Sequence, residues 1–235
     1  FAEAMSDFET KAKYERFAKA YEFYFDKSTR FMRGLDSKGE WRTPFNPRAS
    51  THRSDDYCEG TAWQWTWFVP HDVDGLVNLM GGEDAFVQKL DSLFTVDSSL
   101  EGEMISSDIS GLIGQYAHGN EPSHHVIHLY NYVNRPWRTQ ELVDSVYQSQ
   151  YANSTDGLSG NEDCGQMSAW YILNSMGFYQ VCPGKPIYSI GRPAFDKAVI
   201  NLPEEKTFSI VVKNNEKKNK YIESVTLNGQ PLNTP

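Results

Sequence analysis

Apolar and polar positions recur with the 3.6-residue spacing of an amphipathic helix in several separate segments of the chain. Pro122 stands where the first turn of a helix tolerates proline, and a Thr-x-Glu-Leu sequence from Thr139 is typical of a helix entry. This pattern predicts helices over residues 10–25, 84–94, 121–133, 138–151 and 166–176. The loops at 26–48 and 98–120 are longer than ordinary connections and are therefore expected to carry function.

The pattern changes after about residue 184, where short β-branched runs alternate with turn-forming Pro, Gly and Asn. It predicts strands within PIYSIG (186–191), KAVINL (197–202), TFSIVVK (207–213) and YIESVTLNG (221–229). The final NGQPLNTP reads as a hairpin just begun. Helices therefore come first and strands last.

Composition narrows the possible partners. The 235 residues are 39% hydrophobic, which is enough for one large domain or for one domain with a small appendix. The net charge is −9 and the 22 Lys and Arg are scattered, so we expect no nucleic-acid or anionic-membrane partner. No apolar run approaches the roughly 20 residues of a membrane span, so no membrane insertion is expected.

Cysteine and aromatic content give weaker signals. Cys58, Cys164 and Cys182 are odd in number and lack metal-ligand spacing, so we expect free thiols buried in the core. Aromatic residues make up 14% of the chain. They either fill a large helical core or form platforms on which sugar rings stack.

The first candidate for chemistry is Glu59, which lies directly before Gly60 and a helix-like run. Trp63 and Trp67 share a face of that run. A carboxyl beside aromatic rings is partly desolvated, which raises its pKa and favours a proton donor. Alternatively, Glu59 is a helix N-terminal residue stabilised by the helix dipole alone.

A second cluster, within residues 118–128, contains four of the six histidines of the chain together with Asn120 and Glu121. Zinc is disfavoured, because the His124/His128 pair lacks the glutamate of a His-Glu-x-x-His motif and no cysteine joins it. The oxygen ligands of Asn120 and Glu121 suit calcium better. A structural loop backed by core histidines remains the alternative.

The third candidate is Asp163, beside Glu162 at a glycine-rich helix entrance. Backbone N–H groups there are expected to keep Asp163 ionised, as a general base requires. Together with a protonated Glu59, it would form the acid and base pair of glycoside hydrolysis. An inverting displacement needs about 6.5–9.5 Å between two such carboxyls.

Three long motifs resemble glycoside hydrolase family 92, the calcium-dependent exo-acting α-mannosidases of bacteria. They are EGTAWQWTWFVPHDVDGL, HGNEPSHHVIHLYNY and GNEDCGQMSAWYILNSMGFYQVCPG, and FMRGLDSKGEW and YIESVTLNG extend the likeness over nearly the whole chain. The resemblance implies a general acid at Glu59, a general base at Asp163, and mannose-containing glycans as substrate. It also implies that Asn120 and Glu121 hold Ca²⁺ or the sugar, that His118, Trp63, Gln64 and Gln166 line the pocket, and that Asn161 orients the water. Some members carry an aspartate where this chain has Asn161, which implies that Asp163 acts alone or with Glu162.

The resemblance also implies a fold. Family members have a β-sandwich followed by an (α/α)6 barrel. We therefore expect a mainly α portion of that barrel over residues 1–184, and strands belonging to a β-sandwich over 185–235. The chain would be a fragment that needs the missing N-terminal part of the enzyme as its partner, or a degenerate relative.

Two other functions remain open at this stage. One is a non-catalytic glycan-binding or structural fragment. The other is a different (α/α)6 carbohydrate enzyme, such as a glucosidase or a disaccharide phosphorylase. The family's glycan diet implies a periplasmic, cell-surface or secreted location.

Overall fold

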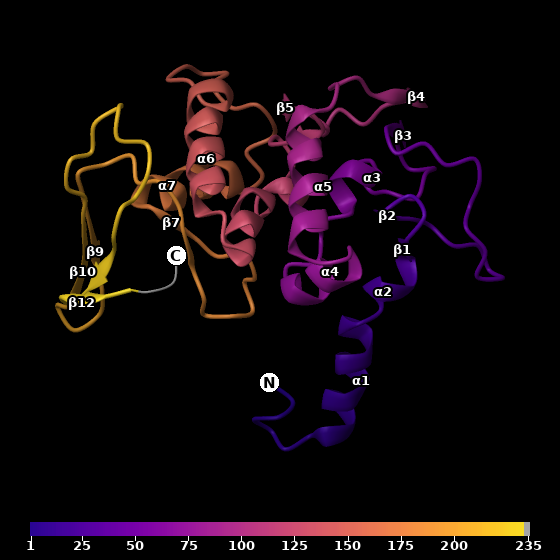
Figure 1. The fold of residues 1–235 in the computed structure, drawn as a ribbon, viewed down its shortest axis with the longest axis horizontal. Helices are drawn as coiled ribbons and strands as arrows, with labels where there is room; N and C mark the ends of the chain where they lie inside the picture. The colour runs from indigo at the N-terminus through magenta and orange to yellow at the C-terminus, as the bar shows by residue number, and fades with distance from the viewer. Residues whose placement is uncertain (233–235) are drawn as a thin grey trace. The chain divides into compact units, whose positions relative to one another are not determined.

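The computed structural model describes residues 1–232 and forms two compact units. The first unit consists of Phe1–Ser107 with Gly114–Tyr116, and the second of Asp108–Ile113 with the chain from Ala117 onward. Figure 1 colours the first from indigo to magenta and the second onward to yellow. The domain boundary predicted near residue 184 falls inside the second unit and stays a prediction.

Helices and two short sheets make up the first unit. Its elements are α1 (Phe8–Ala18), α2 (Tyr21–Tyr24), β1 (Phe25–Asp26), β2 (Phe31–Met32), β3 (Ala49–Thr51), α3 (Ala62–Trp65), α4 (Val73–Leu79), α5 (Glu83–Thr95) and β4 (Glu101–Met104). β1 pairs antiparallel with β2, and β3 pairs parallel with β4. The helix predicted over 10–25 is divided into α1 and α2, and the one predicted over 84–94 is confirmed as α5.

The core of the first unit forms around α5. Phe86, Leu90 and Leu93 lie on one face of that helix and are fully buried. The ring of Phe86 meets the buried ring of Trp67 edge to face, with centroids 5.4 Å apart. This apolar stripe explains the strong periodicity of the segment.

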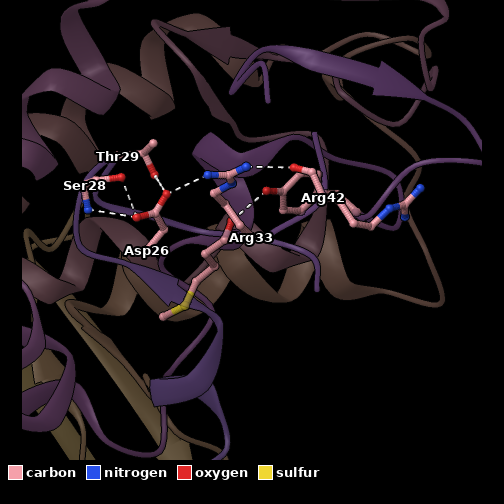
Figure 2. A network of polar contacts seen from close by, with 7 residues as sticks. Asp26, Ser28, Thr29, Arg33 and Arg42 are labelled. Carbon is pink, nitrogen blue, oxygen red and sulfur yellow. Dashed lines mark hydrogen bonds and ion pairs between the residues drawn. The ribbon is translucent and has the colours of Figure 1, made fainter. Parts of the chain in front are cut away.

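A buried ion pair fixes the hairpin formed by β1 and β2 (Figure 2). The Asp26 carboxylate lies 2.7 Å from an Arg33 nitrogen and accepts hydrogen bonds from Ser28 and Thr29. Burial opposes ionisation of Asp26, but these donors outweigh it and hold the pKa of the carboxyl well below its usual range. The Arg33 guanidinium also donates to the Arg42 carbonyl at 2.7 Å.

The second unit contains the remaining elements, apart from Tyr116 at the start of β6. They are β5 (Leu112–Ile113), β6 (Tyr116–Ala117), η1 (Glu121–Ser123), η2 (Val126–Val133), α6 (Pro136–Gln150), α7 (Gln166–Met176), β7 (Phe178–Tyr179), β8 (Ser189–Ile190), β9 (Lys197–Asn201), β10 (Thr207–Val211), β11 (Thr226–Leu227) and β12 (Gln230–Pro231). The pairs β7/β8, β9/β10 and β11/β12 are antiparallel. The helices predicted over 138–151 and 166–176 are confirmed as α6 and α7.

One predicted helix takes a different form. Residues 121–133 make two 3₁₀ helices, η1 and η2, instead of one α-helix. Most side chains of η2 are buried, so the segment lacks the polar face of an amphipathic surface helix. It ends at Asn134, which adopts the left-handed conformation, and Pro136 then opens α6.

The C-terminal strands largely follow the predicted pattern. β9 and β10 pair over five residues, from Thr207 opposite Asn201 to Val211 opposite Lys197. The hairpin expected at the end of the chain is confirmed as β11 and β12 within the described residues. Asn228 and Gly229 both have positive φ in its turn, as a type I′ connection requires. The last three residues of the predicted NGQPLNTP segment, 233–235, lie outside the described residues.

The cysteines correct one expectation. All three are free thiols, but Cys58 and Cys164 are exposed and Cys182 is half-buried, so burial of the thiols was wrong. Within residues 1–232 the longest helices fall short of the length and apolar content that a bilayer crossing needs.

Candidate functional site

Glu59 belongs to the first unit, in the turn between β3 and α3. Its backbone has φ 51°, a left-handed conformation that is uncommon for residues other than glycine. The side chain is exposed. The partial desolvation by Trp63 and Trp67 expected from the sequence is therefore wrong for this chain, because both of these rings are buried in the core while Glu59 is exposed.

Helix α3 begins directly after the Glu59 turn. The Thr61 hydroxyl accepts from Trp63 N at 3.2 Å, and Gln64 Oε1 accepts from Thr61 N at 2.7 Å, which together form a capping box. The Gln64 amide also donates to the Gln115 carbonyl at 2.5 Å. Gln64 is thus buried and engaged within the unit, and its predicted contact with substrate stays a prediction.

Trp63 packs in an unusual environment. Its ring meets Phe31 edge to face at 4.9 Å, and the Lys89 Nζ lies 4.3 Å from the Trp63 ring centroid and 3.2 Å from that of Phe31. Burial, with a smaller contribution from the charge of Arg30, lowers the pKa of Lys89 to about 7. The residue between the two rings is therefore a lysine that loses its charge close to neutral pH, a feature that the sequence pattern did not reveal.

An open hollow of about 430 Å³ adjoins the Glu59 turn. The residues that line it come from one short stretch of chain and are mostly ionisable: His52, Arg53, Asp55, Asp56, Tyr57, Cys58 and Glu59. The Glu59 side chain thus borders a polar depression.

Asp163 belongs to the second unit, in the turn before α7. Asp163, Cys164 and Gly165 have consecutive positive φ values of 45°, 56° and 98°. The neighbouring Glu162 caps the helix, because its carboxylate accepts from Ser168 N at 3.1 Å. Hydrogen bonds from Ser168 lower the pKa of Glu162. Asp163 itself is exposed, and the expectation that backbone N–H groups hold its carboxylate stays a prediction.

Neutral histidines lie behind this turn. The Tyr151 hydroxyl donates to the Met167 carbonyl at 3.0 Å, so the contact of 2.8 Å between Tyr151 and His118 Nε2 requires a proton on that nitrogen. Gln166 Nε2 donates to His124 Nδ1 at 3.1 Å, which leaves His124 Nε2 to donate to the His118 carbonyl at 3.0 Å. The tautomers of both histidines are thus assigned by their partners.

Burial keeps this group uncharged. It lowers the pKa of His118 to about 2, of His124 to about 4 and of His128 to about 3. His118 is fully buried against Trp170, with ring centroids 4.4 Å apart, so its predicted contact with a sugar stays a prediction. Tyr151 and Trp170 complete the group and were not singled out from the sequence, although both lie in segments whose helical period was recognised.

Asn120 and Glu121 bring two oxygen-bearing side chains to the start of η1. Asn120 is 6% exposed and Glu121 is half-buried. Among residues 1–232, no three His, Cys, Asp or Glu side chains come together as a metal site. A calcium ion takes six to eight oxygen ligands. These two residues fit part of such a shell, and the other ligands would come from substrate, water or the rest of the enzyme.

Asn161 is exposed and donates to an Asp108 carboxylate oxygen at 3.1 Å. Asn161, Glu162 and Asp163 therefore present their polar groups within one turn of the second unit. Glu59, Trp63 and Gln64 belong to the first unit. The predicted acid and base thus lie in separate units, each in an exposed turn.

Comparison with known proteins agrees with these motifs. The model of the glycosyl hydrolase family 92 catalytic domain matches residues 1–235. A family GH92 α-mannosidase from Bacteroides thetaiotaomicron, solved in complex with mannoimidazole, is similar with a TM-score of 0.90 and 40% identity, over 98% of this chain and 31% of that one. A family GH92 inverting mannosidase from the same organism is similar with a TM-score of 0.83 and 37% identity, over 98% of this chain and 32% of that one.

A curated fungal relative is also similar to this chain. The protein, described as an uncharacterized secreted glycosidase of Arthroderma benhamiae, is 33% identical over 183 residues, which are 77% of this chain and 21% of the relative. The chain thus spans about a fifth to a third of the length of its relatives. With a family model that matches along its whole length, the chain belongs to glycosyl hydrolase family 92.

Proposed function

We propose that this chain contributes both catalytic carboxylates to an inverting exo-α-mannosidase of the α-1,2 type. The observation that carries the proposal is the match of the family's catalytic domain over residues 1–235, which includes both exposed turns. One solved relative is described as an inverting mannosidase, which supports the same stereochemistry here. The remaining two thirds of the enzyme, with its β-sandwich and the rest of an (α/α)6 barrel, would be the partner of this chain.

The two carboxylates take different parts in the reaction. Glu59 donates a proton to the glycosidic oxygen as the bond to the leaving group breaks. Asp163 removes a proton from a water molecule that attacks the anomeric carbon from the opposite face, with Asn161 orienting that water. The proton that Glu59 loses and the proton that Asp163 gains balance over the turnover.

The remaining predicted residues position the sugar. Trp63, Gln64, His118 and Gln166 shape the pocket, and Asn120 and Glu121 hold the sugar or Ca²⁺. A calcium ion held by these residues would orient two adjacent hydroxyls of the sugar and favour distortion of its ring. The buried histidine group would keep the Asn120 and Asp163 loops in place without adding charge. Substrates of this class imply export to the periplasm, the cell surface or the medium.

The test is mannose release from α-1,2-mannobiose by the full-length enzyme that contains this chain. We expect release that stops with a calcium chelator and resumes with added calcium, and β-mannose as the first product in a proton NMR time course. Initial release of α-mannose would contradict the inverting mechanism. Release of glucose from glucosides, or dependence on phosphate, would identify another carbohydrate enzyme, and sugar binding without turnover would identify a glycan-binding fragment.

A further inference from the structure

Contacts with other parts of the first unit hold almost every position of the turn that carries Glu59. The Asp55 carboxylate accepts from Thr51 N at 2.5 Å, and the Tyr57 hydroxyl donates to the Met32 carbonyl at 2.6 Å. The Cys58 carbonyl accepts from Trp65 Nε1 at 2.8 Å. Glu59 itself remains exposed at the centre of these anchors.

Asp56 is anchored from two sides. Its carboxylate pairs with the Arg42 guanidinium and packs directly on Gly34, so that a methyl group added at Gly34 would collide with it. Arg42 is itself fixed, because its N donates to the Gly34 carbonyl at 3.1 Å and its carbonyl accepts from Arg33. The buried Asp26–Arg33 pair therefore extends through Arg42 to the turn, and Figure 2 shows its first part.

The anchors bridge long stretches of sequence. Arg42 reaches Asp56 across 14 positions, and Tyr57 reaches Met32 across 25. On the other side, Gly60 packs on Trp65, whose ring atoms lie 2.7 Å from where a methyl group at Gly60 would be. These contacts leave the turn little freedom, although the ion pair is partly exposed and adds little to stability.

We propose that Arg42 and Tyr57 are positioning residues for the general acid, which hold the 55–60 turn so that the Glu59 carboxyl meets the glycosidic oxygen. Neither touches the substrate in this scheme; both act through the backbone of the turn. A displacement of about 1 Å of a catalytic group costs up to about 100-fold in rate. This inference rests on the proposed role of Glu59.

The experiment compares two substrates with the full-length enzyme. An α-1,2-mannobioside has a poor leaving group and needs a proton donor. The 2,4-dinitrophenolate of 2,4-dinitrophenyl α-mannoside departs without protonation. We expect Glu59→Gln to lose about 100- to 10,000-fold in kcat on the mannobioside. Its activity on the dinitrophenyl glycoside should be largely kept.

Tyr57→Phe and Arg42→Met should show the same selectivity with smaller losses, about 10- to 100-fold on the mannobioside. Tyr21→Phe and Arg48→Met are matched controls. They remove a hydroxyl bonded to Asp72 and a guanidinium beside Ser99, and we expect no selectivity from either. Tyr57→Phe keeps the shape of the side chain, so it tests the positioning role even if Arg42→Met does not fold.

Equal losses on both substrates, or none, for Tyr57→Phe would overturn the positioning role while Glu59→Gln remains selective. If Glu59→Gln also lacked selectivity, the assignment of the acid itself would be wrong, and the positioning role would be overturned with it. A second readout separates geometry from stability. The fall of kcat/KM for the mannobioside at high pH, which reports the acid, should shift in Tyr57→Phe and stay in place in Tyr21→Phe.

Discussion

The turns that carry Glu59 and Asp163 present their carboxylates in different ways. Both residues have positive φ and exposed side chains. The Glu59 turn is held by partners from distant parts of the sequence, above all Arg42 and Met32. The Asp163 turn combines three consecutive left-handed residues and the cap that Glu162 makes on α7 with one contact from Asn161 to distant Asp108. The two turns thus differ in how much of their conformation is set by the backbone itself.

The surroundings of the two turns differ as well. In the second unit, a group of neutral histidines and aromatic rings lies behind the turn. In the first unit, a buried amine, that of Lys89, lies between the rings of Phe31 and Trp63. The contrast predicts different responses to substitution and to pH.

The largest effect should come from Asp163→Asn. Activation of water is needed whatever the leaving group, so we expect kcat to fall about 100- to 10,000-fold on both the mannobioside and the dinitrophenyl glycoside. Steady-state kinetics of the full-length enzyme measure this. Asp156→Asn, in an exposed nearby loop, is the matched control. Loss on the mannobioside alone would make Asp163 a second contributor to leaving-group departure, and would break the distinction between the turns.

The next largest effect concerns Trp170, whose ring packs on the buried histidines behind the Asp163 turn. Trp170 is fully buried and donates to the His124 carbonyl at 3.0 Å. Trp170→Ala should lower the free energy of unfolding by about 3–5 kcal/mol, because it leaves a cavity and an unpaired carbonyl. Urea denaturation measures this. Trp137 is 43% exposed, so Trp137→Ala should lower the free energy of unfolding much less. Equal losses in the two variants would show that Trp170 does not support the structure behind the Asp163 turn.

The next effect in size is a loss of stability of the second unit in acid. The pKa values of His118, His124 and His128 are depressed by burial to about 2, 4 and 3, against about 6.5 in an unfolded chain. The unfolded chain therefore binds more protons below pH 6.5, so stability is complete above that pH and is lost as the pH falls toward these values. The loss reaches about 1.4 kcal/mol per pH unit for each histidine.

Urea denaturation at a series of pH values between 6.5 and 4 tests this expectation. His128→Gln should make the slope of stability against pH shallower. An unchanged slope in His128→Gln would mean that this histidine accepts its proton in the folded state.

The smallest effect is a change with pH in the stability of the first unit above neutral pH, because this change depends on one group. The pKa of Lys89 is lowered to about 7, against about 10.4 unfolded. Between these values the unfolded chain binds the extra proton, so stability rises with pH and is lost as the pH falls toward 7, by up to about 1.4 kcal/mol per unit. Lys89→Met should abolish this rise between pH 7 and 9 in denaturation experiments. A rise that persists in Lys89→Met would come from another group.

Regular elements with a strong period could be predicted from the sequence, and the environment of single side chains could not. The pattern located α5 and α7 closely because their apolar residues recur on one face. It missed the 3₁₀ form of 121–133, because a segment buried on nearly all sides has no polar face to fix its period. It also misjudged Glu59, since neighbours in sequence such as Trp63 point into the core while Glu59 points to solvent.

The site shows the same division. The motifs predict both catalytic carboxylates, and that assignment stays a prediction. The sequence could not show that Glu162, and not Asp163, makes the cap on α7. The contact between Arg42 and Asp56 could not be predicted either, because a contact across 14 positions leaves no periodic signal in the sequence. Contacts of this kind depend on how segments distant in sequence come together.

The way the Glu59 turn is anchored has a consequence for recombination between family members. Segment 55–60 cannot be exchanged as a cassette, because its partners lie in 31–42 and at Trp65, so a chimera that keeps Glu59 aimed must transfer residues 31–65 together. The Asp163 turn has distant partners as well, because Asn161 donates to Asp108 and Trp170 to the His124 carbonyl. A donor segment around Asp163 would therefore have to bring residues 108–124 together with 159–170, so neither half of the proposed catalytic pair can be moved as a short segment.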